Sequence, residues 1–404
     1  MNITDKGKDN ATLSGLKVVE FAHVIAGPLA GTLLADLGAD VVHVEDPAHG
    51  DPQRKAGPTK NGIHLWWKVS ARNKRSVTLD LRNEEGRELA RDLVRWADVV
   101  IVNFRAATLE RWQLDFTSLQ RINPRLIMLQ VTGFGLVSSK RNSPGFGKVG
   151  EAMSGVVNIT GFPDGPPVHT GFSHGDSVTG LMGAYAIMAA LYRRDHDPDF
   201  QGEWIDLSLF ESLYRLIEWQ VIFHDQLGRS PERVGNSLQA APAAVINTFR
   251  TGDGEWMTVT SGTPRSVRNV AELLGQHVED YATSAMQAER REHLDALLAE
   301  WISAHTLAEC LDEMERLEVV ASAIFSVEDI LKDPTYRELD AVVTVDDPDL
   351  GEVRMQNVVP RMVNHPGAVR HSAPALGEHN QQVYGEMLAR SAEELDRLRT
   401  AGVI

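Results

Sequence analysis

Apolar and polar residues along the first 134 positions follow a strand–helix order that repeats. The apolar runs have the length and β-branched content of buried strands, and the segments between them carry apolar residues at helical spacing. The predicted strands are 16–22, 39–45, 76–81, 98–104 and 125–134, and the predicted helices are 29–37, 83–97 and 108–120. A turn at Gly27-Pro28 is expected before the first helix. This alternation predicts an α/β fold with a doubly wound, Rossmann-like parallel sheet.

The pattern changes in the second half of the chain. Residues 203–219 begin as a strand and continue as a helix, GDGEW at 252–256 is a hairpin signal, and 267–319 is helical. Residues 340–365 alternate as antiparallel strands do, and the tail ends in an amphipathic helix. We therefore predict a large α/β domain over 1–224, a smaller α+β domain over 225–335, and a segment over 336–404 that returns to the large domain.

One carboxylate, Asp176, stands between two small residues directly before a long apolar helical pattern that runs to Arg194. An Asp at this place either caps the helix or lies in its first turn, where the helix dipole favours negative charge. A simple helix cap is the plain interpretation. Gly180 and Gly183 remove side-chain bulk, which predicts that another element packs closely against the first two turns.

The net charge, the apolar runs and the single cysteine limit which partners and which cellular location this protein can have. A formal charge of −16 argues against nucleic acid or an anionic membrane as the main partner. The N-terminal segment has no apolar core, and the longest apolar run, 178–192, is too short to cross a bilayer, so a cytoplasmic protein is expected. The single cysteine, Cys310, has apolar helical neighbours and is interpreted as a packed thiol. No Gly-x-Gly-x-x-Gly follows the first strand, no P-loop or paired-Cys motif occurs, and the histidines show no metal-ligand spacing.

Several separated segments together resemble the class III CoA-transferases, the family of formyl-CoA transferase and the carnitine and bile-acid CoA-transferases. The resemblance runs from about Leu16 to the C-terminus. Its segments are GLKVVEFAHVIAGPLAGTLLADLGADVVHVE, NKRSVTLDLRNEEGRELARDLVRWADVVIVNF, TLERWQLDFTSLQRINPRLIMLQVTGFG, GDSVTGLMGAYAIMAALYRR and PALGEHN. The family's nucleophile is an Asp in a G-D-x-x-x-G segment, and Asp176 holds that position.

The resemblance implies a CoA-transferase that moves CoA from an acyl-CoA to a carboxylic acid through an aspartyl anhydride and an aspartyl-CoA thioester on Asp176. It implies coenzyme A or acyl-CoA as substrate, no permanently bound cofactor and no metal. The helix N-terminus is expected to keep Asp176 ionised. The CoA-binding positions carried over by the resemblance lie after the parallel strands. They are Ile25, Ala26, Leu79, Arg82, Asn103, Phe104, Arg105, Arg111 and Phe146.

Two alternatives stay open beside this interpretation. An α-methylacyl-CoA racemase or epimerase of the same fold would need a His as second acid/base group, where this chain has Gly145-Phe146-Gly147. A non-catalytic acyl-CoA-binding protein would retain the fold without exchange. Asp46-Pro47 also replaces a family arginine after the second strand, and no glycine run occurs between Leu227 and Gly262. The resemblance further implies a homodimer of two interlocked ring-shaped chains.

Overall fold

The protein is described here by a computed structural model that places residues 11–404. The expectation that the N-terminus is no signal peptide concerns mainly residues 1–10, which lie outside the described part. The chain divides into two compact units. The large unit comprises the residues up to Val156 together with 170–218 and 337–404, and the small unit comprises 157–169 and 219–336.

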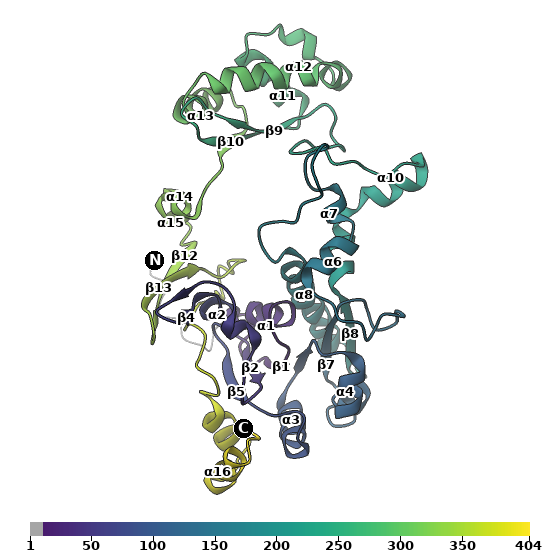
Figure 1. The fold of residues 1–404 in the computed structure, drawn as a ribbon, viewed down its shortest axis with the longest axis vertical. Helices are drawn as coiled ribbons and strands as arrows, with labels where there is room; N and C mark the ends of the chain where they lie inside the picture. Colours follow the sequence, from purple (N-terminus) through teal and green to yellow (C-terminus); the bar gives the residue numbers. More distant parts are fainter. Residues whose placement is uncertain (1–10) are drawn as a thin grey trace. The chain divides into compact units, whose positions relative to one another are not determined.

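A six-stranded parallel sheet forms the centre of the large unit (Figure 1). Its order is β5-β2-β1-β6-β7-β8, and every neighbouring pair is parallel. The strands are β1 (Lys17–Phe21), β2 (Asp40–Glu45), β5 (Arg75–Thr78), β6 (Val99–Val102), β7 (Ile127–Thr132) and β8 (Glu203–Ser208). The chain starts at β1 in the middle of the sheet and adds β2 and β5 on one side. It then returns to add β6, β7 and β8 on the other side. The direction of winding therefore reverses between β1 and β6, and open α/β sheets bind ligands beside such a point.

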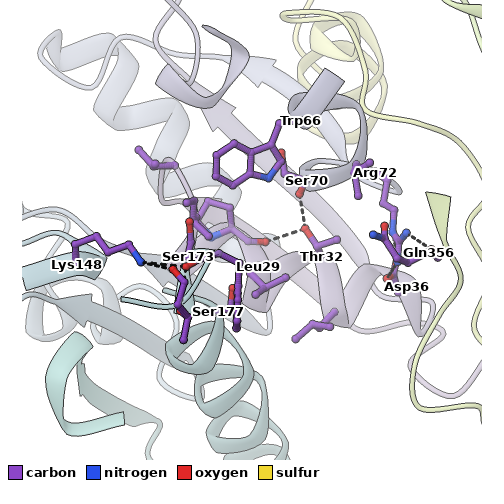
Figure 2. A pocket seen from close by; sticks show the side chains of 18 residues that line it. Leu29, Thr32, Asp36, Trp66, Ser70, Arg72, Lys148, Ser173, Ser177 and Gln356 are labelled. Carbon is purple, nitrogen blue, oxygen red and sulfur yellow. Dashed lines mark hydrogen bonds and ion pairs between the residues drawn. The ribbon is translucent and has the colours of Figure 1, made fainter. Parts of the chain in front are cut away.

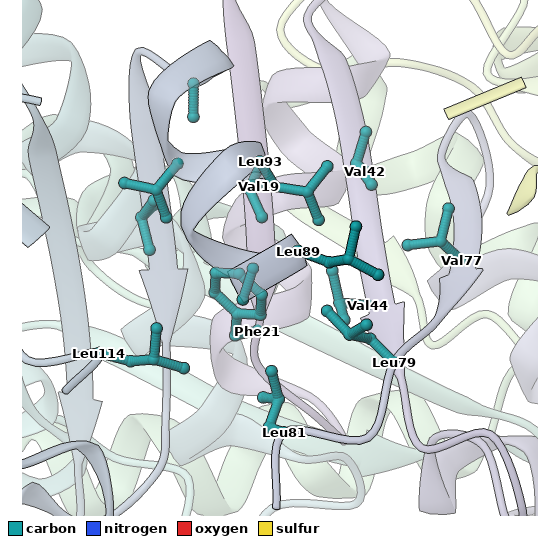
Figure 3. Packing of buried hydrophobic residues seen from close by; sticks show 14 of the residues in the cluster. Val19, Phe21, Val42, Val44, Val77, Leu79, Leu81, Leu89, Leu93 and Leu114 are labelled. Atoms are coloured by element: carbon teal, nitrogen blue, oxygen red, sulfur yellow. The ribbon is translucent and has the colours of Figure 1, made fainter. Parts of the chain in front are cut away.

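Helices cover both faces of this sheet, as the sequence predicts. The alternation of side chains along β1 shows the two layers. Val19 and Phe21 join the core beneath α3 (Glu84–Trp96) and α16 (Ala392–Thr400) (Figure 3). Val18 joins the core beneath α1 (Ala26–Asp36) and α8 (His174–His196). The helices of the large unit are α1 (Ala26–Asp36), α2 (Leu65–Ser70), α3 (Glu84–Trp96), α4 (Ala106–Trp112), α5 (Phe116–Gln120), α6 (Gly147–Met153), α8 (His174–His196), α9 (Leu209–Tyr214) and α16 (Ala392–Thr400).

The C-terminal segment completes the large unit by covering the edge strand β5. The Asn380 side chain accepts the Thr78 N–H at 2.9 Å and donates to the Thr78 hydroxyl at 2.7 Å, while the Tyr384 hydroxyl donates to the Thr78 carbonyl at 2.9 Å. Unpaired edges of sheets invite association, so these contacts protect this edge. The other elements here are η2 (Pro52–Lys55), β3 (Thr59–Lys60), β4 (Ile63–His64), η3 (Arg215–Ile217), β12 (Val342–Asp347), β13 (Gly351–Gln356) and η5 (Gln381–Met387).

The small unit has an antiparallel sheet of order β11-β10-β9 packed against helices. The turn between β9 and β10 lies at the predicted hairpin signal. Cys310 is buried in this core, which confirms its interpretation as a packed thiol. The elements are α10 (Trp219–Leu227), β9 (Val245–Arg250), β10 (Trp256–Ser261), α11 (Pro264–Leu273), η4 (Val278–Tyr281), α12 (Ser284–Ser303), α13 (Leu307–Arg316), β11 (Ala321–Ala323) and α14 (Val327–Lys332); α7 (Val156–Ile159) and α15 (Pro334–Glu338) cross its limits.

Two local predictions are wrong. The first helix begins at Ala26, before the expected Gly27-Pro28 turn, because proline fits the first helical turn, where its missing N–H is not needed. Residues 108–120 form two helices, since Gln113 adopts a left-handed conformation with φ of 55° and ends α4. Within residues 11–404, no helix is long and apolar enough to cross a membrane, and no three His, Cys, Asp or Glu side chains gather as metal ligands would.

Candidate active site

Asp176 lies in the first turn of α8, which packs directly on α1 and β7. A Cβ added at Gly180 would lie 2.8 Å from the Leu29 Cβ, and one added at Gly183 would lie 2.7 Å from a methyl carbon of Leu129. The sequence predicts this close packing from the two glycines, and the structure confirms it. The absence of side chains on this face therefore fixes the start of α8 against the central sheet.

The Asp176 carboxylate fills a space left by Gly147, the first residue of α6. A Cβ at Gly147 would lie 2.1 Å from Asp176 Oδ2, which is far inside van der Waals contact. A Cβ at Gly175 would lie 2.7 Å from the Gly147 carbonyl oxygen, so the backbones of α6 and α8 touch at their first turns. Asp176 is the third residue of α8, and Ser173 is the residue before the helix. The simple-cap interpretation of Asp176 is therefore wrong.

A neighbouring carboxylate takes the hydrogen bond that the start of the helix offers. Glu151 is fully buried; its Oε1 accepts the Gly175 N–H at 3.1 Å, and its Oε2 lies 3.0 Å from the Lys148 ammonium. Burial and the negative charge of Glu151 raise the pKa of Asp176, Lys148 opposes them, and the net pKa is about 6. The helix N-terminus is expected to favour the ionised form of Asp176, whereas burial and Glu151 act in the opposite direction. With a net pKa of about 6, the Asp176 carboxyl is still mostly ionised at neutral pH.

A cavity of about 760 Å³ opens beside the first turn of α8, entirely within the large unit (Figure 2). Ser173 and Ser177, which flank Asp176 in the sequence, line it together with Lys148. At the opposite end of the cavity, Arg72 is paired with Asp36 at 2.6 Å. The wall between these ends is mainly apolar and comes from the β1–α1 turn, α1, α2 and the loop before α8. Its apolar residues are Val24, Ile25, Pro28, Leu29, Leu33, Trp66, Val69 and Phe172.

The two cations of this cavity are already engaged by the protein. The Lys148 ammonium contacts Glu151 and also donates to the carbonyls of Thr170 and Phe172 at 3.1 and 3.2 Å. Both carboxylate oxygens of Asp36 accept from the Arg72 guanidinium. The cavity therefore presents apolar walls, three serine side chains and compensated charges, a composition typical of a small-molecule site.

Most of the predicted CoA-binding residues follow the carboxyl ends of the parallel strands and line one of three cavities. Asn103 at the end of β6 accepts the His23 N–H at 3.0 Å and donates to the His23 carbonyl at 2.7 Å, so it ties β6 to the turn after β1. Ile25 lines the large cavity. Leu79, Arg82 and Phe104 line one of about 120 Å³, and Asn103, Phe104, Arg105 and Phe146 line one of about 150 Å³; Ala26 and Arg111 line none of the three.

Two of these residues are engaged by neighbours. Arg82 is an exposed cation, but its guanidinium pairs with Asp80 at 2.6 Å and with Asp46 at 2.9 Å. Asp46 is the residue that replaces the family arginine, so this departure supplies a carboxylate to Arg82. The Phe104 ring packs edge-on against Trp112, with ring centroids 5.2 Å apart.

The sequence comparisons decide the family. The sequence profile of CoA-transferase family III matches residues 13–380. The chain belongs to this family. It is 38% identical to the succinyl-CoA–D-citramalate CoA-transferase of Chloroflexus aurantiacus, with 97% of this chain and 98% of that protein covered. It is 31% identical to the formyl-CoA:oxalate CoA-transferase of Streptomyces coelicolor, with 97% and 99% covered.

Solved structures agree with the family. The crystal structure of a CAIB/BAIF family protein from Brucella suis has a TM-score of 0.81 and 34% identity, with 94% of this chain and all of that chain covered. The family and these relatives support transfer of CoA between an acyl-CoA and an acid as the activity of this chain. The mixed α/β architecture with a central parallel sheet is shared with this neighbour, as the sequence predicts.

Three residues near the site were not predicted from the sequence. Val24 follows β1, lines the large cavity and adopts a φ of 72°, which is unusual for a β-branched residue. Its N–H donates to the buried carboxylate of Asp51, which in turn lies beside His43. No short motif marks these residues, because positions 24, 43 and 51 come together only when β1 and β2 pair.

Proposed function

We propose that this family III enzyme transfers CoA by covalent catalysis on Asp176. The single observation that carries the proposal is the setting of this carboxylate. The Asp176 side chain is half-buried in the space at Gly147. Ser173 and Ser177, which come before and after it in the chain, line the 760 Å³ cavity. Nothing among the contacts of residues 11–404 holds the Asp176 carboxylate in an ion pair or hydrogen bond of its own. Asp176 itself is not among the residues that line the cavity, but its carboxylate has no competing partner, and we propose that it attacks a ligand bound there.

The reaction proceeds in balanced steps. An Asp176 oxygen attacks the thioester carbonyl of the donor, the C–S bond breaks, and a mixed anhydride and CoA thiolate form. The thiolate then attacks the aspartyl carbonyl, which leaves an aspartyl-CoA thioester and releases the donor acid with one oxygen from Asp176. The acceptor carboxylate attacks this thioester, the thiolate returns to the acceptor carbonyl of the new anhydride, and Asp176 leaves with one oxygen from the acceptor.

The environment of Asp176 suits a nucleophile. With a pKa of about 6 the carboxylate is mostly ionised at neutral pH, yet it is less hydrated and more basic than an exposed aspartate. The N-terminal end of α8 provides a favourable field for the negative charge that forms on the attacked carbonyl. Removal from bulk water also protects the anhydride from hydrolysis.

We place CoA along the carboxyl ends of β1 and β6, between which the winding of the sheet reverses, and of the edge strand β5. Arg105 and Arg111 are the proposed phosphate partners, with Arg82 as a third that must share its charge with Asp46 and Asp80. Ile25 and Ala26 are proposed contacts of the pantetheine arm, and Leu79, Asn103, Phe104 and Phe146 complete the list. The acyl group is then placed in the large cavity, beside Trp66 and Lys148.

We also propose a homodimer. One face of α8 carries Leu181, Tyr185, Met188 and Tyr192 at helical spacing, and their side chains are 59%, 72%, 39% and 69% exposed. An exposed apolar stripe of this length is typical of a surface that another chain covers. The interlocked arrangement is supported by the family resemblance alone. Light scattering on the purified protein tests the dimer: a mass near 89 kDa is expected, twice the 44.5 kDa of one chain, and a 44.5 kDa species would contradict it.

The experiment that tests the function is intact-protein mass spectrometry after incubation with acyl-CoAs, followed by hydroxylamine or borohydride trapping. The names of the relatives suggest succinyl-CoA and formyl-CoA as first donors, and D-citramalate, glutarate and oxalate as first acceptors. We expect a donor-dependent adduct that maps to Asp176 and is absent in Asp176→Ala. No adduct, but solvent deuterium in the α-carbon of a branched acyl-CoA, would indicate a racemase instead. CoA binding with neither reaction would indicate a binding protein.

A further inference from the structure

The turn after β1 holds its shape against a local conformational preference. Val24 has a φ of 72°, a region that L residues rarely adopt and that β-branched side chains adopt least. Such a conformation persists only where the surroundings over-determine it, and it is typical of functional sites. Val24 and its neighbour Ile25 both line the large cavity.

Asp51 is the group that holds Val24 in place. Both carboxylate oxygens of Asp51 lie 3.1 Å from the Val24 nitrogen and accept its N–H. Oδ1 also accepts the Gln53 N–H at 2.8 Å, and the Asp51 side chain is fully buried. A hydrogen bond to a buried ionised acceptor is stronger than one to a neutral acceptor, and such a bond is directional. In the observed conformation the Val24 N–H points at this carboxylate.

Asp51 is fixed in turn by a buried network of alternating charges. His43 Nε2 lies 3.3 Å from Asp51 Oδ2, and its Nδ1 is hydrogen-bonded to Glu20. The Lys74 ammonium is 3.0 Å from both oxygens of Glu20 and donates to the Pro28 carbonyl at 2.6 Å. All four side chains are buried, so two anions and two cations compensate one another. Through Pro28, the network also reaches the first turn of α1.

The other side of the same turn is held by Asn103, which makes two hydrogen bonds to the His23 backbone. His23 and Val24 are thus fixed from two directions, by β6 through Asn103 and by the loop after β2 through Asp51. This turn lies where the sheet reverses its winding, beside the position proposed for acyl-CoA.

We propose that Asp51 is a positioning residue for acyl-CoA. It holds Val24 in its strained conformation and thereby presents Val24 and Ile25 to the cavity. The inference rests on the proposed function, because that function places the ligand there. Asp51 does not touch the reacting atoms, so its loss is expected to weaken binding and to leave the chemical step nearly unchanged.

The test is a double-mutant cycle between Asp51→Asn and Val24→Gly, read out as the dissociation constant of CoA by calorimetry. Asparagine keeps the size of the side chain but lacks the charge and one acceptor. Glycine adopts a φ of 72° without strain, so a protein with glycine at position 24 no longer needs the restraint. We expect Asp51→Asn to weaken CoA binding about tenfold in the Val24 background and by less than about twofold in the glycine background, a strong coupling of neighbouring sites.

A purely structural role of Asp51 predicts the same loss of affinity in both backgrounds, and that result would overturn the proposal. Steady-state kinetics give a second readout: Asp51→Asn should raise KM for the acyl-CoA with kcat within about twofold of the parent. If Asp51→Asn does not fold on its own, folding of the double variant with Val24→Gly is the expected rescue, and failure of both contradicts the proposal. Failure of the proposed function is distinguishable, because it appears in the unmodified protein as absent CoA binding or absent exchange.

Discussion

Asp176 and Asp51 are two aspartates of the same unit, both largely removed from water, with opposite electrostatic settings. Burial raises the pKa of each carboxyl group. Around Asp51, the hydrogen bond and charge of His43 and the backbone N–H of Gln53 overcome burial and lower the pKa to about 2. Around Asp176, Glu151 adds to the effect of burial, and only Lys148 opposes it, so the pKa rises to about 6.

The difference shows how one functional group can serve two purposes. The Asp51 carboxylate is saturated with donors, and the folded state is stabilised by its ionisation. The Asp176 carboxylate lacks such donors, so the folded state is destabilised when it ionises at neutral pH. Each pKa unit corresponds to about 1.4 kcal/mol between the two protonation states. We propose that the first setting supports structure and that the second keeps a nucleophile reactive.

The largest expected effect is on the exchange reaction. Asp176→Asn keeps the shape of the side chain but cannot form an anhydride, so CoA exchange should fall by at least about 10³-fold. The measurement is kcat for acyl-CoA formation, followed by chromatography at saturating acyl-CoA. Exchange by Asp176→Asn at a tenth of the parental rate would remove Asp176 from the mechanism.

The space around the Asp176 carboxylate offers a second test. In Gly147→Ala the new methyl group would meet Asp176 Oδ2 at 2.1 Å and must displace it, which is expected to lower kcat roughly 10²-fold. Alanine favours a helix start as well as glycine does, so thermal unfolding should change little. Gly262→Ala is the control, because a Cβ there meets no atom within 4 Å. Equal activity of both variants would show that the carboxylate position is unimportant.

The two aspartates should respond to asparagine with opposite changes in the free energy of unfolding. At pH 8, Asp176→Asn should raise it by roughly 2–3 kcal/mol, whereas Asp51→Asn should lower it by about 2 kcal/mol. The gain from Asp176→Asn should vanish as the pH falls through 6 towards 4. In that range Asp176 of the folded parent becomes protonated, so the cost of its buried charge disappears. The loss from Asp51→Asn should persist at pH 5 and disappear only towards pH 2. Urea titrations at pH 8 and pH 5 measure both, and changes of the same sign would contradict the comparison.

The smallest expected effect is a displacement of the pH profile. Activity requires ionised Asp176, so kcat/KM should fall below about pH 6. Glu151→Gln keeps an acceptor for the Gly175 N–H but removes the charge that raises the pKa of Asp176. The acidic limb should therefore move to lower pH, by up to about one unit. Lys148→Met should move it to higher pH, and shifts in the reverse directions would refute the assignment of these charges.

The sequence predicts much of the frame on which these residues stand. The parallel strands, the helix that carries Asp176, and the close approach at Gly180 and Gly183 all follow from local patterns, and the structure confirms them. Local patterns fail where the outcome depends on distant residues. The raised pKa of Asp176 does not follow from the local sequence, because it depends on burial and on the charge of Glu151, which lies on another helix. No local pattern indicates Asp51, because its partners Val24, His43 and Gln53 lie in the turn after β1, on β2 and in η2.

An oxygen-18 experiment tests the central claim most directly. The acceptor acid is labelled in its carboxylate, one turnover is allowed, and the protein is digested for mass spectrometry of the peptide that contains Asp176. The anhydride route predicts one labelled oxygen in the Asp176 side chain, and label in the donor acid released in the next turnover. Exchange of CoA with no label in Asp176 or in the released acid would contradict covalent catalysis on this residue.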